Sequence, residues 1–515
     1  MKEKISILLL LVFSSTLLTT CTQQSERAVE QRTPSLVELV KKGESEIFTV
    51  PLDRYKAGTK PLPIGVFDSG IGGLTVLAAI LELDAFDNLT HESGPDGKPD
   101  FENERFVYLG DQANMPYGNY PSEQKVDFLR ELIIKDAIFL LGDRYWLCAN
   151  APMPQQDKPP VKAIVIACNT ATAYGLETVS DALKQWELPV HLVGVVEAGA
   201  DGAIQAINQP GRRGAVAVLA TVGTCRSEGY VRAIQKSANE AGIKPPAVIQ
   251  QGCLGLAGAI EGDPSYITSS EAASNVNYRG PAVGNKAAPI YPGLLAQYSF
   301  NTEGLLGDLD SPVTWRLNSI ENYIRYHTAT LVERYRRSGG SEPISTVILG
   351  CTHFPYQMNS IAKSFGRLRS FRKPDGGEPY KNLIFEQLSF IDPAALTATR
   401  LYEALAAAGL LINKADESIL TADEFYISVP NVSLVGVKLA ANGGFTYEYK
   451  YGRVPGNFTA EYVKRVPMSS ANLSDKVRRS IKTRTPEVWK RLVTFSNKSP
   501  RTKNLPPSTR IMLNN

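Results

Sequence analysis

IVIACNTATA, residues 164–173, joins an apolar, β-branched run to polar residues and a helix-forming segment. The run predicts a buried strand that ends at Cys168. A second stretch, VILGCTHFP (347–355), repeats this arrangement with Cys351. Strand, turn and helix in this order are typical of parallel α/β folds, in which ligands gather at the carboxyl ends of the strands. The two stretches therefore predict an α/β fold with a thiol at each of two such strand ends.

The same alternation runs through much of the chain. Apolar strands at LPIGVF, RFVYLGD, PVHLVGVV, GAVAVLAT and AVIQQGC are separated by helical patterns, as expected of parallel sheets with crossover helices. A weak internal repeat pairs GVFDSGIGGLTVL (65–77) with AVLATVGTCRSEGY and IVIACNT with VILGCTH. We therefore predict two similar parallel-sheet α/β lobes that face one another across a cleft.

Composition limits the function classes. Of 515 residues, 43% are hydrophobic and 21% charged, as in globular proteins, and a net charge of +3 gives no reason to expect a nucleic-acid partner. Four histidines, widely spaced, argue against a histidine-based metal site. Cys148, Cys168, Cys225, Cys253 and Cys351 form no regular disulfide framework.

The N-terminus has the features of an export signal. Lys2 and Lys4 precede the apolar run ISILLLLVF, and LLTTC ends at Cys21. This placement resembles a bacterial lipoprotein signal, which predicts a signal peptide over 1–20 and lipidation of Cys21. An ordinary cleaved signal and an uncleaved anchor are the alternatives. We expect a lipid-anchored protein of the cell envelope that faces the periplasm, with the outer membrane slightly favoured because CTQQS lacks an acidic residue.

The remaining chain divides by composition. Residues 21–61 are polar and predict a tether after Cys21, residues 62–205 form the first lobe, completed by about 360–410, and residues 206–359 form the second lobe with an insertion at 262–343. Residues 411–515 are an extension of unknown role. Its last part, 475–515, carries eleven Lys or Arg against two acidic residues and predicts a solvated, irregular tail, with binding to an anionic surface as the alternative.

The predicted site combines thiols with an acid and an imidazole. A helix N-terminus after Cys168 or Cys351 would lower a thiol's pKa and attract anions, and paired thiols could exchange protons with two faces of one carbon. Asp68 and Ser69 end a strand in FDSGIGG, where Asp68 could bind a substrate ammonium. His353 lies two residues after Cys351 and could tune its protonation. Each residue taken alone is also compatible with simple packing or turn capping.

Five segments carry a family resemblance in a fixed order: GVFDSGIGGLTVL, YLGDQANMPYG, IVIACNTATA, TVGTCRSEGY and VILGCTHFP. Together they closely resemble the motifs of bacterial glutamate racemases, over segments 62–85, 104–143, 161–261, 344–365 and 386–408. The resemblance implies two α/β lobes with the active site in the cleft between them. It also implies cofactor-independent interconversion of L- and D-glutamate, an amino acid as small-molecule partner, and leaves a homodimer open.

The resemblance also assigns roles to individual residues. Cys168 and Cys351 would be the acid/base pair, assisted by Asp68 and His353 respectively, and Glu261 keeps the family's spacing of eight residues after Cys253. The predicted substrate contacts are Asp68, Ser69, Tyr117, Gly118, Asn169, Thr170, Thr352 and His353. The residues between Cys253 and Glu261 depart from the family's proline-containing pattern.

An export signal, the insertions and the extension are foreign to racemases that serve cytoplasmic cell-wall precursor synthesis. Three alternatives therefore stay open: an envelope lipoprotein that binds an amino acid or wall fragment without turnover, an aspartate-specific racemase, and a one-thiol hydrolase or decarboxylase. The presence of both cysteines favours inversion, because binding alone or one-thiol chemistry does not require the pair.

Overall fold

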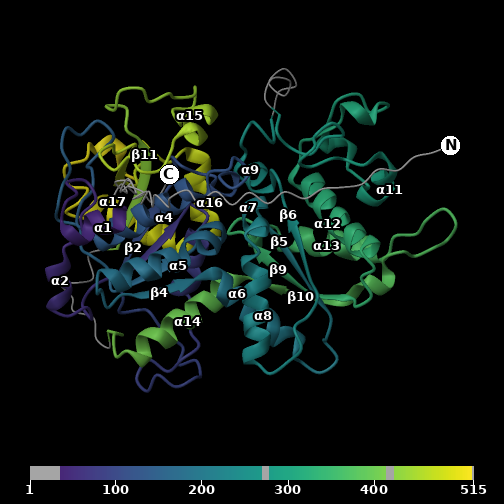
Figure 1. Cartoon of the computed structure of the whole chain (residues 1–515), viewed down its shortest axis with the longest axis horizontal. Coiled ribbons are helices and arrows are strands. Elements are labelled where there is room, and N and C mark those ends of the chain that lie inside the picture. Colours follow the sequence, from purple (N-terminus) through teal and green to yellow (C-terminus); the bar gives the residue numbers. More distant parts are fainter. Residues whose placement is uncertain (1–34, 269–277, 413–422, 513–515) are drawn as a thin grey trace, which may run out of the picture.

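The computed structural model describes residues 35–268, 278–412 and 423–512. The predicted signal peptide and Cys21 lie outside these residues. The described chain forms two α/β lobes that lie side by side (Figure 1), each built on a largely parallel sheet. The predicted fold class is confirmed.

The sheet of the first lobe has the strand order β12-β11-β2-β1-β3-β4. Neighbouring strands run parallel, except that β12 is antiparallel to β11. Its strands are β1 (Ile64–Asp68), β2 (Phe106–Gly110), β3 (Ala163–Ile166), β4 (His191–Gly194), β11 (Glu424–Pro430) and β12 (Val463–Pro467).

Helices cover both faces of this sheet. Because side chains alternate along a strand, Val66 and Val165 pack on one face and Phe67 and Ile164 on the other. The first face is covered by α3 (Leu74–Leu81), α14 (Pro393–Ala407) and α17 (Pro486–Lys498), and the second by α4 (Val126–Leu141) and α5 (Asn169–Gln185). Burial on both faces explains why these strands are apolar along their whole length.

The second lobe has the parallel strand order β10-β9-β5-β6. Its strands are β5 (Ala215–Ala220), β6 (Val248–Gly252), β9 (Ile344–Gly350) and β10 (Ile384–Ile391). Helices α12 (Ile320–Arg337) and α13 (Met358–Arg369) cover one face, and α6 (Val195–Ile207) and α8 (Gly229–Glu240) cover the other. The insertion 262–343 thus supplies a core helix, α12, together with α11 (Leu295–Tyr298) and a small hairpin, β7 (Leu305–Leu306) and β8 (Arg316–Leu317).

Residues 360–410 do not simply complete the first lobe, as we predicted. Strand β10 pairs with β9 in the second sheet, while α14 packs against α3 of the first lobe and α6 of the second. The apolar pattern of a strand does not specify which strand it pairs with, because pairing depends on tertiary contacts between segments that are distant in sequence.

The segment before residue 62 is not a tether over its described part. Helices α1 (Leu36–Lys42) and α2 (Leu52–Lys56) pack on the first lobe, with Leu36, Phe48 and Tyr55 buried against α4 and α5. The α1 N-terminus has a capping box between Ser35 and Glu38. Only a few widely spaced apolar residues make this contact. Their spacing shows neither helix nor strand periodicity, so the sequence does not reveal that this segment is packed on the lobe.

The C-terminal extension is also ordered, contrary to the predicted irregular tail. Strands β11 and β12 enlarge the first sheet, and the extension adds α15 (Tyr447–Gly452), α16 (Asp475–Arg484) and α17. Val488, Trp489 and Leu492 of α17 are buried in the core of the first lobe. The tail's many cations lie on surfaces around these core residues. The high cation content of the sequence therefore obscures the apolar face of an amphipathic helix.

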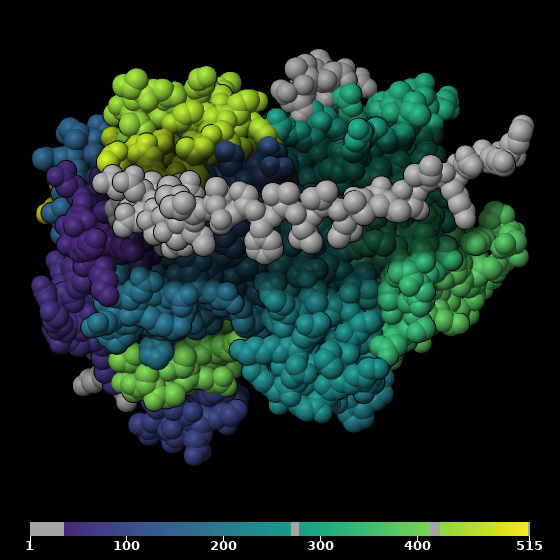
Figure 2. All heavy atoms as spheres, in the orientation of Figure 1, coloured from purple at the N-terminus to yellow at the C-terminus, as the bar shows by residue number. Residues whose placement is uncertain are grey.

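The extension also reaches the second lobe. The Arg279 guanidinium lies 3.5 Å from the centre of the Tyr447 ring, and in Figure 2 the yellow-green surface of the extension meets the teal surface of that lobe. Lys476 on α16 donates to the Glu261 carbonyl at 3.3 Å. Among the described residues, no helix has the length and apolar character needed to cross a membrane.

Candidate active site

A cavity of about 90 Å³ lies between the lobes. One water requires roughly 10–15 Å³ by this measure, so the cavity has room for a small organic molecule. It is lined by Ser69, Met115, Pro116, Tyr117, Gly118, Asn119, Cys168, Asn169, Thr170, Thr221, Val222, Cys253, Leu254, Gly255, Ala257, Gly258, Glu261, Asp263, Tyr266, Cys351, Thr352 and His353. The structure therefore brings together all the predicted site residues within its described part except Asp68, which lies just outside the lining.

Cys168 enters the cavity from the first lobe. It follows β3 and is the N-cap of α5, where its sulfur accepts from the Ala171 N–H at 3.5 Å. The thiol donates to Ser69 Oγ at 3.6 Å. Burial, reinforced by the nearby Asp68, raises the pKa of Cys168 to about 12. The sequence predicted a lowered pKa from the helix N-terminus, but desolvation outweighs it and keeps this thiol protonated.

Cys351 enters the same cavity from the second lobe, at the end of β9. Its sulfur lies 3.6 Å from His353 Nδ1, and His353 Nε2 lies 2.7 Å from Glu261 Oε1. Burial opposes a charge on His353, yet the hydrogen bonds to Cys351 and Glu261 outweigh it and raise the pKa of His353 well above its usual value. The imidazole therefore lies between the Cys351 sulfur and the Glu261 carboxylate and contacts both.

Asp68 is held behind the cavity at the end of β1. Its Oδ2 accepts from the Gly70 N–H at 3.0 Å, while Oδ1 is buried without a hydrogen-bond partner among the described residues. Burial raises the pKa of Asp68, and the positive charge of His353 partly opposes this rise. A buried carboxylate oxygen without a donor is suited to receive one from a bound ligand.

Hydroxyl and amide groups line the side of the cavity near α5. The hydroxyl oxygens of Thr170, Thr221 and Thr224 lie 3.0–3.1 Å from one another. Asn169, the first residue of α5, accepts from the Tyr230 hydroxyl at 2.5 Å. The N–H groups of a helix's first turn have no partner within the helix, so this side of the cavity suits a carboxylate.

Sequence reasoning missed several residues of the cavity wall, among them Thr221, Asp263 and Tyr266. Thr221 belongs to a motif that was recognised, TVGTCRSEGY, but was given no role. Tyr266 belongs to the insertion, and its ring lies against Gly255 and Gly258: a Cβ on Gly258 would approach the ring to 2.4 Å. The glycines in the segment between Cys253 and Glu261, which departs from the family pattern, therefore make room for the Tyr266 ring. No local sequence pattern predicts that Tyr266 lies at the cavity.

Within the described residues, no group of three or more His, Cys, Asp or Glu side chains is arranged to hold a metal ion. The lining offers the thiols of Cys168, Cys253 and Cys351, the His353 imidazole, the carboxylates of Glu261 and Asp263, and several hydroxyl and N–H donors.

Curated sequences similar to this chain include several glutamate racemases. That of Enterococcus faecalis is 37% identical over 175 residues, which are 34% of this chain and 47% of that protein. That of Pediococcus pentosaceus is 34% identical over 172 residues, 33% of this chain and 48% of that protein. The chain spans about half the length of these curated relatives. A longer match, to the glutamate racemase of Chlorobaculum tepidum, has 26% identity over 358 residues, 70% of this chain and 85% of that protein.

No family model matches the chain. Solved structures similar to it include a glutamate racemase isoform from Bacillus anthracis, with 22% identity, a TM-score of 0.40, and coverage of 69% of this chain and 84% of that one. The Francisella tularensis glutamate racemase in complex with D-glutamate has 21% identity, a TM-score of 0.36, and coverage of 69% and 85%. In its motifs and over these matched segments, the chain is similar to the bacterial glutamate racemases.

Proposed function

We propose that this protein is a cofactor-independent amino-acid racemase that interconverts L- and D-glutamate. The observation that carries the proposal is the pair of buried thiols, Cys168 and Cys351, that line one cavity from different lobes. Similarity to proteins named glutamate racemase supports glutamate as the substrate.

The surroundings of the two thiols support different roles in the first step. Cys351, whose sulfur lies 3.6 Å from His353 Nδ1, is the base that removes the α-proton. Cys168, with its raised pKa, is the thiol that returns a proton to the other face of the α-carbon. After one turnover the two protonation states are exchanged, and the reverse reaction starts from the exchanged form. An acid and a base held at one carbon accelerate proton transfer because both are in place before reaction.

The remaining groups bind the substrate and stabilise charge. The α-ammonium binds beside Ser69 and is attracted by the Asp68 carboxylate that lies behind this residue, and the N–H groups at the start of α5 bind a carboxylate. Donors fixed at the α-carboxylate would stabilise the charge that develops as the α-proton leaves. Glu261 holds His353 protonated and so acts on Cys351 through the imidazole.

The test is α-proton exchange in deuterated water. We would follow L-glutamate by NMR and D-glutamate by chiral chromatography, using reduced protein without residues 1–21. We expect exchange with D-glutamate formation, and loss of racemisation in Cys168→Ala and in Cys351→Ala. Cys225→Ala, which removes a thiol that does not line the cavity, is the matched control and should retain activity.

Each other outcome points to one of the alternatives. Exchange with aspartate alone would identify an aspartate-specific racemase. Binding of an amino acid without exchange would identify a binding protein, and turnover that survives one cysteine substitution would indicate one-thiol chemistry.

We also propose that the protein is anchored in the cell envelope through a lipid on Cys21. The sequence around that residue supports the proposal. Metabolic labelling with a fatty-acid analogue should mark the parent protein but not Cys21→Ala, and equal labelling of both would exclude this site.

A further inference from the structure

One wall of the cavity rests on the C-terminal extension. The wall consists of residues 115–119, which follow β2 and include the 3₁₀ turn Tyr117–Asn119. Its backbone carbonyls receive hydrogen bonds from the extension: the Tyr451 hydroxyl donates to the Pro116 carbonyl at 3.2 Å, and the Lys450 ammonium donates to the Met115 carbonyl. Residues more than three hundred positions away in sequence thus contact this wall directly.

Arg465, on β12 of the extension, contacts the wall indirectly, through Asp136 of α4. Its Nη2 donates to Asp136 Oδ1 at 2.8 Å, and the Tyr117 hydroxyl lies 2.6 Å from Asp136 Oδ2. The same hydroxyl lies 2.5 Å from Asp111 Oδ2. The side chain of Tyr117 is therefore fixed between two carboxylates, one of which is paired with a cation from the extension.

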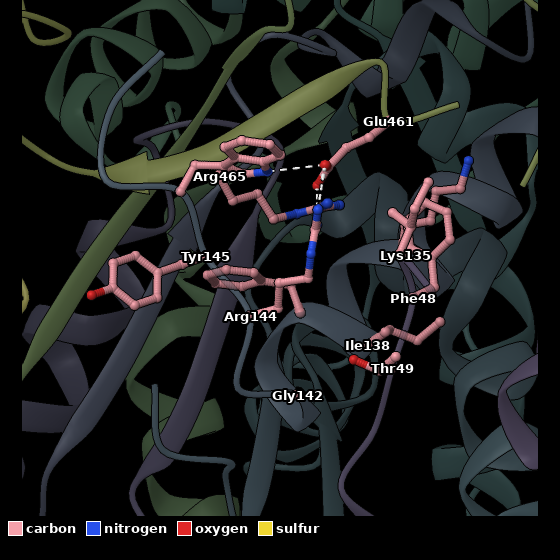
Figure 3. Close-up of a pocket in the computed structure, with 12 residues that line it drawn as sticks. Phe48, Thr49, Lys135, Ile138, Gly142, Arg144, Tyr145, Glu461 and Arg465 are labelled. Carbon is pink, nitrogen blue, oxygen red and sulfur yellow. Dashed lines mark hydrogen bonds and ion pairs between the residues drawn. The ribbon is translucent and has the colours of Figure 1, made fainter. Parts of the chain in front are cut away.

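Figure 3 shows the surroundings of Arg465, at a small cavity of about 20 Å³ between α4 and the extension. Arg144 and Glu461 form a two-pronged ion pair there, with distances of 2.5 and 2.9 Å. This second pair joins the same surfaces and limits how far β12 can move relative to the loop after α4. The small cavity itself has room for no more than about two waters.

The second arginine, Arg453, holds the loop before the wall. Its Nη2 donates to Asn114 Oδ1 at 2.6 Å, and the Asn114 amide donates to the two Asp111 oxygens at 3.0 and 2.8 Å. Arg453 also lies 3.4 Å from the Tyr120 hydroxyl. Both arginines are therefore linked to Asp111 by hydrogen bonds: Arg453 through Asn114, and Arg465 through Asp136 and Tyr117.

All members of this network are buried. Arg453 and Arg465 are each 6% exposed, Tyr117 is 1% exposed, and Asp111 and Asp136 are fully buried. Two buried carboxylates around one hydroxyl carry more negative charge than that hydroxyl's single proton can satisfy, so the cations are needed to hold the arrangement. Removing Arg465 would leave the buried Asp136 carboxylate without its cation, and removing Arg453 would leave the buried Asn114 Oδ1 without its donor, so the wall would shift in either case.

We propose that Arg453 and Arg465 are positioning residues of the active site, which hold the cavity wall at Tyr117 and Gly118 in its substrate-binding position. The extension is then part of the catalytic unit and not an appended module. This inference rests on the proposed racemase function for its kinetic consequence, but its structural consequence can be measured without any substrate.

The experiment compares the parent with Arg453→Lys, Arg453→Met, Arg465→Lys and Arg465→Met. Arg479→Met is the matched control, because Arg479 is an exposed arginine of α16 in the same extension and makes none of the contacts described above. Backbone hydrogen exchange of residues 111–120 is measured by mass spectrometry, and kcat and KM are measured for glutamate with each variant at the same folded concentration.

We expect hydrogen exchange in 111–120 to become at least tenfold faster in both methionine variants and to stay unchanged in Arg479→Met. Displacement of a binding wall by about 1 Å costs up to roughly a hundredfold in rate, so kcat/KM should fall about 10- to 100-fold, chiefly through KM. Guanidinium ions added to Arg453→Met or Arg465→Met should restore part of the loss, which a general folding defect would not allow.

Two results would overturn the inference: unchanged hydrogen exchange in 111–120, or normal kcat/KM in folded methionine variants of an active parent. If a methionine variant does not fold, the lysine variant at the same position tests the positioning role. Lysine keeps the positive charge but lacks the planar set of N–H donors of the guanidinium. An inactive parent would contradict the proposed function instead, and the hydrogen-exchange comparison would still test the positioning role.

Discussion

At the scale of single residues, the two cysteines that we propose as acid and base differ in their hydrogen-bond partners. Cys168 is desolvated and beside a carboxylate, whereas Cys351 is beside an imidazole that Glu261 holds protonated. The sequence shows part of this difference, because a histidine follows Cys351 and none follows Cys168. The pairing of His353 with Glu261 could not be read from the motif, because α9 (Leu256–Glu261) of the second lobe brings Glu261 next to His353 only in the folded structure.

Glu261→Gln tests this assignment. The Glu261 charge helps to raise the pKa of His353, so the amide variant loses the imidazolium at a lower pH than the parent. We expect the alkaline limb of the pH profile of kcat/KM to move to lower pH, with a roughly 10- to 100-fold loss at pH 8. Initial racemisation rates between pH 6 and 9.5 measure the shift. Glu240→Gln, an exposed change on α8, should leave the profile unaltered, and an unmoved profile in Glu261→Gln would contradict the role of the imidazolium.

Asp136 gives a second, substrate-free prediction at this scale. Burial, reinforced by Asp111, raises its pKa from 3.8 to about 7, so the folded state binds this proton more tightly than the unfolded chain does. Its contribution to stability is full below about pH 4 and is lost as pH rises through about 7.

Urea unfolding between pH 4 and 8 measures this effect. Asp136→Asn should remove a slope of up to about 1.4 kcal/mol per pH unit from the free energy of unfolding over that range. The exposed Asp127→Asn, on the same helix, should retain the parent's slope. Equal slopes in all three proteins would mean that Asp136 is ionised throughout.

At the scale of elements, the glycine-rich turn between β1 and α3 brings the lobes together. A Cβ on Gly72 would lie 2.5 Å from Thr352 Oγ1 and 3.0 Å from His353 Cε1. Gly72→Ala must therefore push the turn after β9, and we expect kcat/KM to fall about a hundredfold. Gly366→Ala is the matched control: it lies within α13 with no atom near its added methyl, and it should be active and slightly more stable. Normal kinetics in Gly72→Ala would show that this contact is dispensable.

The elements that the sequence predicts well are those whose signal is local. The strands that end at Asp68, Cys168 and Cys351 are continuous apolar runs followed by turn residues and a helix, and the structure places them as expected. Strand β10 was given to the wrong lobe because its partner is chosen by tertiary packing. The sequence predicts an irregular extension because cations dominate its composition, whereas the apolar residues of α17 that enter the core are few: Val488, Trp489, Leu492, Val493 and Phe495.

At the scale of the whole molecule, the extension cannot be separated from either lobe. It adds β11 and β12 to the first sheet next to β2 and covers one face of that sheet with α17. It contacts the second lobe at three places. Tyr447 packs on Arg279, Lys476 donates to the Glu261 carbonyl, and the Arg484 guanidinium lies 4.1 Å from the centre of the Tyr356 ring. A site between two lobes depends on their relative position, and these contacts lie on both sides of that junction. The molecule is therefore one folding unit around the cavity.

Truncation after residue 412 tests this view most directly. It would leave the edge of β2 unpaired and expose the core residues that α17 covers, and an unpaired apolar edge strand favours association with other chains. We expect the truncated protein to be aggregated or unfolded by size-exclusion chromatography and circular dichroism. The milder Trp489→Ala should fold but lose about 3–5 kcal/mol of stability, because it opens a cavity beneath the sheet. A soluble truncated monomer that still racemises glutamate would show that the lobes alone make the site and that the extension serves another purpose.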